Sequence, residues 1–117
     1  MIHFTTDTHT IIDYFANHKY IQVDTETDGE FNFANKIILL QLGDRENQFV
    51  VDARQYNLAE LNPVFKNKIC ILHNAKFDIK FLWLHGVQLD YVYDTLLAER
   101  LLNAGNETFK GFYGLDR

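Results

Sequence analysis

Two acidic residues, Asp24 and Glu26, lie two positions apart at the end of an apolar, strand-like segment that begins at Ile21. Side chains alternate between the two faces of a β-strand, so both carboxylates are expected to point the same way, roughly 7 Å apart. Two hard oxygen anions held on rigid backbone suit a hard divalent cation such as Mg²⁺ or Mn²⁺. The alternative is a strand end that opens into solvent at residues 27–29, where acidic residues are common.

A third acidic residue of interest, Asp78, lies near the start of a predicted helix over residues 75–85. Asn74 precedes this helix and is expected to be its N-cap. Asp78 is adjacent to Phe77 and one turn before Phe81, which predicts that it points toward the sheet. A carboxylate on the apolar flank of a helix is costly unless it is paired, hydrogen-bonded or bound to metal. The alternative is that Asp78 only complements the positive end of the helix.

Three neighbouring features have both a structural and a functional interpretation. His73 follows a buried strand and is either a hydrogen-bonded core histidine or a ligand. Lys76 and Lys80 lie on the helix side opposite Asp78 and are either solvated or in contact with phosphates. Asp94 precedes the next helix, where it is either an ordinary N-cap or a residue that orients a metal-binding side chain.

The composition limits the class of protein. The chain has 117 residues and is 47% hydrophobic, which predicts one packed globular domain. Cys70 is the single cysteine and lies in an apolar segment, which predicts a buried, reduced thiol in a cytoplasmic protein. No apolar run approaches the ~20 residues of a membrane span, so no membrane partner is expected. Serine is absent, which excludes serine-nucleophile hydrolases. The net charge of −5 opposes phosphate binding unless cations held by the carboxylates reverse its sign.

Hydrophobic periodicity predicts a mixed α/β fold. The predicted strands are 20–25, 37–42, 48–52, 69–72 and 91–93, and the predicted helices begin near residues 8, 75 and 95. Residues 37–52 form a predicted hairpin, expected to lie antiparallel beside strand 20–25. Strand 69–72 is expected to lie parallel to strand 20–25 on its other side, because alternating helices and strands follow it.

These segments together resemble the DEDD-type 3′–5′ exonucleases. Asp24-Thr25-Glu26 resembles their first motif, Asp-x-Glu. Residues 74–78, Asn-x-x-Phe-Asp, resemble the second motif, and Asp94-Thr95 resembles the Asp-Thr helix that follows in these enzymes. The similarity is strongest to the proofreading domain of family A (Pol I-type) DNA polymerases, followed by ribonuclease D-like enzymes. It implies an RNase H-like fold.

The resemblance also implies a mechanism and a substrate. Asp24, Glu26 and Asp78 would be catalytic residues that hold two Mg²⁺ or Mn²⁺ ions, with Asp94 supporting them. The substrate would be the single-stranded 3′ end of DNA, with RNA as the alternative, and a polymerase domain would follow in the full-length protein. The implied substrate contacts are Thr25, Thr27, Asn74, Phe77 and Lys76.

The family completes its site with a third motif, Tyr-x-x-x-Asp or His-x-x-x-Asp, which this chain lacks. Tyr113 and Asp116 are separated by one residue too few, and Phe112 has no hydroxyl. We therefore expect residues 1–117 to be an incomplete 3′–5′ exonuclease domain, weak or inactive by itself. Two other possibilities remain: a nucleic-acid-binding module without turnover, and a structural domain whose acids bind no metal.

Overall fold

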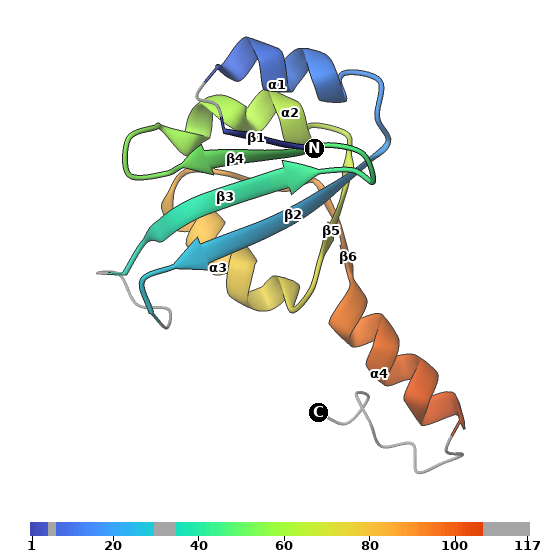
Figure 1. Ribbon diagram of the computed structural model, residues 1–117. Coiled ribbons are helices and arrows are strands. Elements are labelled where there is room, and N and C mark those ends of the chain that lie inside the picture. Colours follow the sequence, from blue (N-terminus) through green and yellow to red (C-terminus); the bar gives the residue numbers. More distant parts are fainter. Residues whose placement is uncertain (5–6, 30–34, 107–117) are drawn as a thin grey trace.

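The computed structural model describes residues 1–4, 7–29 and 35–106 (Figure 1). Asp116, Tyr113 and Phe112, which were considered above for a fourth carboxylate, lie outside these residues. None of the helices in the described ranges is both long and apolar enough to cross a lipid bilayer. The elements follow in this order: β1 (Ile2–Phe4), α1 (Thr8–Phe15), β2 (Tyr20–Thr27), β3 (Ile37–Gly43), β4 (Gln48–Asp52), the 3₁₀ turn η1 (Leu58–Leu61), α2 (Asn62–Phe65), β5 (Ile69–Leu72), α3 (Ala75–Leu84), β6 (Tyr91–Asp94) and α4 (Thr95–Asn106).

The strands form one mixed sheet in the order β1-β4-β3-β2-β5-β6. β3 pairs antiparallel with both β2 and β4, whereas β5 pairs parallel with β2 and β6. The hairpin beside β2 and the parallel strand on its other side are therefore confirmed. The edge strand β1, parallel to β4, was not predicted, because three residues are too few for a periodic signal.

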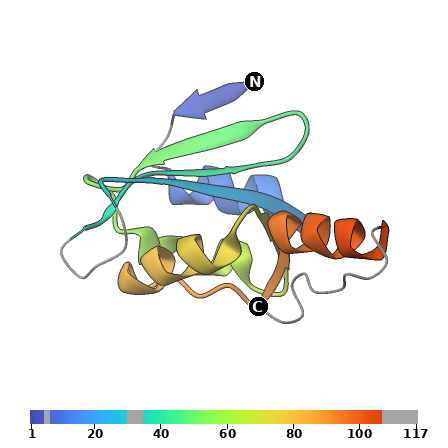
Figure 2. The ribbon, with the colours of Figure 1, turned by 90° about the horizontal axis from the view of Figure 1, so that it is seen from below.

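The helices α1, α2 and α3 lie on the same side of the sheet (Figure 2). We call this side the covered face. Phe15 of α1, Phe65 of α2 and Phe81 of α3 are fully buried there, each stabilising the fold by about 1.5–3 kcal/mol relative to an exposed side chain. The strand residues that face them include Val23 of β2 and Leu42 of β3. We call the opposite side of the sheet the open face.

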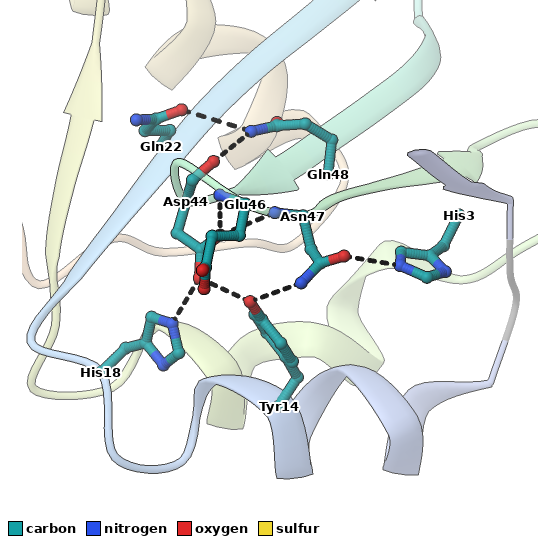
Figure 3. A network of polar contacts seen from close by, with 8 residues as sticks. All are labelled: His3, Tyr14, His18, Gln22, Asp44, Glu46, Asn47 and Gln48. Carbon is teal, nitrogen blue, oxygen red and sulfur yellow. Dashed lines mark hydrogen bonds and ion pairs between the residues drawn. The ribbon is translucent and has the colours of Figure 1, made fainter. Parts of the chain in front are cut away.

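The β3–β4 turn is attached to α1 through the carboxylate of Asp44 (Figure 3). Asp44 accepts hydrogen bonds from the hydroxyl of Tyr14 at 2.6 Å and from Nε2 of His18 at 2.8 Å. It also accepts the backbone N–H groups of Glu46 and Asn47, both at 2.8 Å. Burial alone would raise the pKa of Asp44, but these four bonds outweigh it and hold the pKa well below its usual range. The hairpin that flanks β2 is thereby fixed to the helical layer.

Candidate active site

β2 presents Asp24 and Glu26 on the open face of the sheet. Both residues are exposed, whereas Val23 is buried and Thr25 is half-buried on the covered face. The pairing of β2 with β3 continues to Thr27, with an irregularity just after Glu26. The shared face of the two carboxylates, expected from the sequence, is therefore present.

The second half of β2 is paired on one side only. Its pairing with β5 covers Tyr20 to Gln22, whereas its pairing with β3 reaches Thr27. In the stretch that β5 does not pair, the backbone N–H of Thr25 donates to Oδ1 of Asp24 at 3.0 Å. The Asp24 carboxylate is therefore held close to the backbone of β2, where the sheet opens toward α3.

Asp78 of α3 approaches β2 from the covered face. Its side chain is only 4% exposed, and its Oδ1 accepts a 2.6 Å hydrogen bond from Oγ1 of Thr25. The pKa of Asp78 is raised to about 6, mainly by burial and also by the charges of Asp24 and Asp94, while the Thr25 hydrogen bond opposes the rise. The predicted direction of Asp78, toward the sheet, is confirmed. The site therefore combines a buried carboxyl group with a like charge nearby.

The donor chemistry of these residues fits a divalent cation. The ion pairs formed within the described residues are His18–Asp44 and Arg54–Asp52, so no protein cation offsets Asp24 or Asp78 there. Carboxylate oxygens are the ligands that Mg²⁺ and Mn²⁺ prefer. Within the same ranges, no three His, Cys, Asp or Glu side chains already form a cluster that could hold a metal ion. The convergence of Asp24, Glu26 and Asp78 on one point therefore stays a prediction.

Asn74 is the N-cap residue of α3, as expected, but its side chain does not contribute a capping bond. Its backbone has φ 66° and ψ 58°, the left-handed region that Asn tolerates better than most residues, and its side chain makes no capping bond. The backbone N–H groups of Asn74 and Ala75 instead donate to the Asp94 carboxylate at 3.0 and 2.9 Å. A residue from the neighbouring strand therefore takes over the capping of this helix.

Asp94 also accepts the backbone N–H groups of Leu96 and Leu97, at 2.9 and 3.4 Å. Its interpretation as the N-cap of α4 is confirmed. Burial alone would raise the pKa of Asp94, but the four backbone hydrogen bonds outweigh it and lower the pKa. His73 is exposed and not a core histidine; its Nδ1 lies 2.9 Å from Oγ1 of Thr95.

The other predicted substrate contacts lie around this junction. The hydroxyl of Thr25 is engaged by Asp78, and that of Thr27 donates to the backbone oxygen of Gly29 at 2.9 Å. Phe77 is half-buried, with its ring 5.0 Å from that of Phe81. Lys76 is exposed. Their contacts with a substrate stay predictions.

Sequence reasoning missed a row of glutamines on the open face. Gln22 and Gln41 line a depression of about 270 Å³ together with Asp24 and Gln48. Nε2 of Gln48 donates to Oε1 of Gln22 at 3.3 Å (Figure 3). The Gln48 side chain lies over Gly43, where an added Cβ would be 2.2 Å from it. The alternation of Gln with apolar residues in three strands was the available signal.

An Asp-x-Glu strand at the centre of a mixed sheet, with a buried helical Asp beside it, defines an RNase H-like nuclease domain. Comparison with known proteins agrees, because the family model described as 3′–5′ exonuclease matches residues 1–117. The chain belongs to this 3′–5′ exonuclease family, whose members are phosphodiester hydrolases.

Individual relatives support the assignment. DNA polymerase I of Aquifex aeolicus (strain VF5) is 36% identical over 89 residues, covering 74% of this chain and 14% of that protein. The catalytic core of RRP6 from Trypanosoma brucei, mutant C496S, superposes with a TM-score of 0.76 at 22% identity, covering 88% of this chain and 31% of that one. RNase D of Escherichia coli gives a TM-score of 0.73 at 19% identity, covering 86% and 28%. The chain thus spans a small part of each of these proteins.

Proposed function

We propose that this domain removes nucleotides from single-stranded 3′ ends of DNA, with divalent cations held by Asp24, Glu26 and Asp78. The observation that carries the proposal is the buried Asp78 carboxyl group, which is held against β2 beside Asp24 with no ion pair among the described residues. A carboxylate in this setting is costly unless a cation joins it. The polymerase relative supports DNA as the substrate and proofreading as the role.

The residues would divide the work in the way the family resemblance implies. Asp24 would hold both ions, Glu26 the first and Asp78 the second. Bound cations of this kind activate a water molecule and stabilise the leaving 3′ oxygen. Asn74 and Phe77 would line the path of the terminal nucleotides, because unstacked bases pack well on aromatic side chains.

The remaining substrate contacts and the setting are part of the same proposal. Lys76 would contact a phosphate, and Thr25 and Thr27 would lie beside the terminal nucleotide. A polymerase domain would follow in the full-length protein, and the compartment would be cytoplasmic. The exposed position of Lys76 agrees with a phosphate contact, and the free thiol of buried Cys70 agrees with a cytoplasmic compartment.

RNA is the second candidate substrate. The RNase D that superposes on this chain is described as an exoribonuclease involved in structured RNA processing, and a Brucella melitensis NrnC is described as bound to pGG. Both are less than 25% identical to this chain, so their likeness concerns the fold. DNA is therefore the first choice.

The test pairs metal titration with hydrolysis of 3′-labelled DNA and RNA single strands. Mg²⁺ or Mn²⁺ should bind weakly, with a dissociation constant in the ~millimolar range of sites with few charged ligands. Either substitution, Asp24→Asn or Asp78→Asn, should abolish this metal binding. Asp13→Asn, an exposed acid on α1, is the matched control and should change nothing. Equal binding by wild type and Asp24→Asn would reject the site.

Hydrolysis by these 117 residues should lie near the detection limit. They lack the Tyr or His of the third motif, which would orient the water, and the loss of one such group already lowers the rate ~10²–10⁴-fold. Enzyme-like rates that Asp24→Ala abolishes would mean that a fourth ligand exists. Asp116, or a residue of a neighbouring chain, would then be the first to test.

A further inference from the structure

The junction between β5 and α3 is held by two consecutive side chains, Asp94 at the end of β6 and Thr95 at the start of α4. The Asp94 carboxylate accepts the backbone N–H groups of Asn74 and Ala75, through Oδ1 at 3.0 Å and Oδ2 at 2.9 Å. Oγ1 of Thr95 donates to the backbone oxygen of Leu72 at 3.2 Å and lies 2.9 Å from Nδ1 of His73. Asp94 and Thr95 therefore contact every residue of the segment that connects β5 to α3.

This segment has little support of its own. Asn74 takes the left-handed conformation and offers no side-chain cap, so the first N–H groups of α3 depend on Asp94. Asp78 is the fourth residue of α3, one turn from these bonds. A shift in the start of the helix would therefore move the Asp78 carboxylate relative to Thr25 on β2.

Asp94 differs from an ordinary cap in the same molecule. Asp7 caps α1 by accepting the backbone N–H groups of His9 and Thr10, which lie two and three positions later in the chain. Asp94 caps α4 through Leu96 and Leu97 and also reaches the start of α3, 19 to 20 positions earlier in the chain. One carboxylate thus joins two helix N-termini.

We propose that Asp94 and Thr95 are positioning residues of the metal site: they fix the start of α3 and thereby hold the Asp78 carboxylate against β2. The inference rests on the proposed function for its metal, but its geometric part is independent of any ligand. Partners that orient metal-binding side chains typically contribute 10- to 100-fold in metal affinity.

The experiment compares Asp94→Asn, Thr95→Val and Thr95→Ser with Asp7→Asn as a matched cap control. Amide hydrogen exchange at Asn74 and Ala75 reports the junction without metal, and Mn²⁺ binding, followed by electron paramagnetic resonance, reports the site. Asp94→Asn loses acceptor capacity, so the Ala75 amide should exchange faster and Mn²⁺ should bind about 10-fold more weakly. Thr95→Val should also weaken Mn²⁺ binding, and Thr95→Ser, which keeps the hydroxyl, should restore it. Asp7→Asn makes the same change at the cap of α1 and should leave Mn²⁺ affinity unchanged.

Two results would overturn the inference. The first is unchanged exchange at Asn74 and Ala75 in Asp94→Asn, which would mean that Asp94 does not hold the junction. The second is that Asp94→Asn loses no more Mn²⁺ affinity than the control Asp7→Asn does, although Asp24→Asn abolishes Mn²⁺ binding. If Asp24→Asn leaves Mn²⁺ affinity intact, the proposed function fails by itself, and the exchange data still decide whether Asp94 holds the junction.

Discussion

The hydroxyl of Thr25 donates a 2.6 Å hydrogen bond to the carboxylate of Asp78, 53 positions later in the chain. Thr25 is the middle residue between Asp24 and Glu26, and it points to the face of the sheet opposite to theirs. The first motif therefore contributes more than its two acids, because its central residue holds the acid of the second motif in place.

Replacing Thr25 with Val should weaken both folding and metal binding. Val keeps the β-branched shape but removes the hydroxyl, which leaves a buried carboxyl oxygen without its donor at a cost of about 1–3 kcal/mol. Thr25→Ser keeps the donor and should retain metal affinity. Urea unfolding and Mn²⁺ titration check both variants. An unimpaired Val variant together with an impaired Ser variant would show that the methyl group, not the hydroxyl, matters.

Asp78→Asn should stabilise the metal-free protein above about pH 6. The folded-state pKa of Asp78 is raised to about 6 from 3.8, so its favourable contribution is complete below 3.8 and is lost as the pH rises through 6. The Asn variant does not undergo this loss. At neutral pH its free energy of unfolding should therefore exceed that of wild type by at most roughly 2–3 kcal/mol. Unfolding curves across this range measure it.

Added Mg²⁺ should make the wild type more stable than Asp78→Asn, because a cation stabilises only a folded protein that binds it. Wild type should gain stability with added Mg²⁺, whereas Asp78→Asn should not. A wild-type protein whose stability is independent of pH between about 4 and 7 would contradict the buried, uncompensated state of Asp78.

His85 should make the packing of α3 against β3 sensitive to acid. Its Nε2 accepts the backbone N–H of Ile37 at 3.1 Å, which requires an unprotonated nitrogen. Burial, and next the charge of Lys36, lower the pKa of His85 from 6.5. The stabilisation is therefore present above pH 6.5 and lost as the pH falls through the lower folded-state pKa.

The expected loss is about 1 kcal/mol, the net value of one hydrogen bond. Thermal unfolding at about pH 7.5 and pH 5 should show it in wild type, and His85→Gln, which offers an uncharged acceptor, should show less. If wild type and His85→Gln lose the same stability on acidification, the effect does not come from His85.

Three tyrosines on the open face should promote self-association. Tyr20, Tyr91 and Tyr93 are 51%, 59% and 53% exposed, and the first two flank Ile69 across adjacent strands. Exposed apolar patches of this kind favour association. Sedimentation velocity should show concentration-dependent association that the double substitution Tyr91→Glu and Tyr93→Glu reduces. Trp83→Glu, which alters an exposed aromatic residue of α3, is the control.

Most elements of the fold were predictable because their signals are local. The apolar runs of β3 and β5, the turn at residues 43–47 and the stop of α3 before Gly86 each depend on neighbouring residues in the chain. β1 was missed, since its three residues become a strand only by pairing with β4. The sequence placed Asn74 correctly at the N-cap of α3, but it gave no sign that the carboxylate accepting the N–H groups there lies 20 positions away.

The sequence by itself determined that Asp24 and Glu26 share one face of a strand and that Asp78 points from its helix toward the sheet. Both follow from the periods of strand and helix, which are properties of the backbone alone. Only the tertiary structure decided that Thr25 turns its hydroxyl to Asp78 and that Asp94 joins the starts of α3 and α4. These contacts depend on which strands pair and where β2 and β5 diverge, and such long-range packing leaves no periodic trace in the chain.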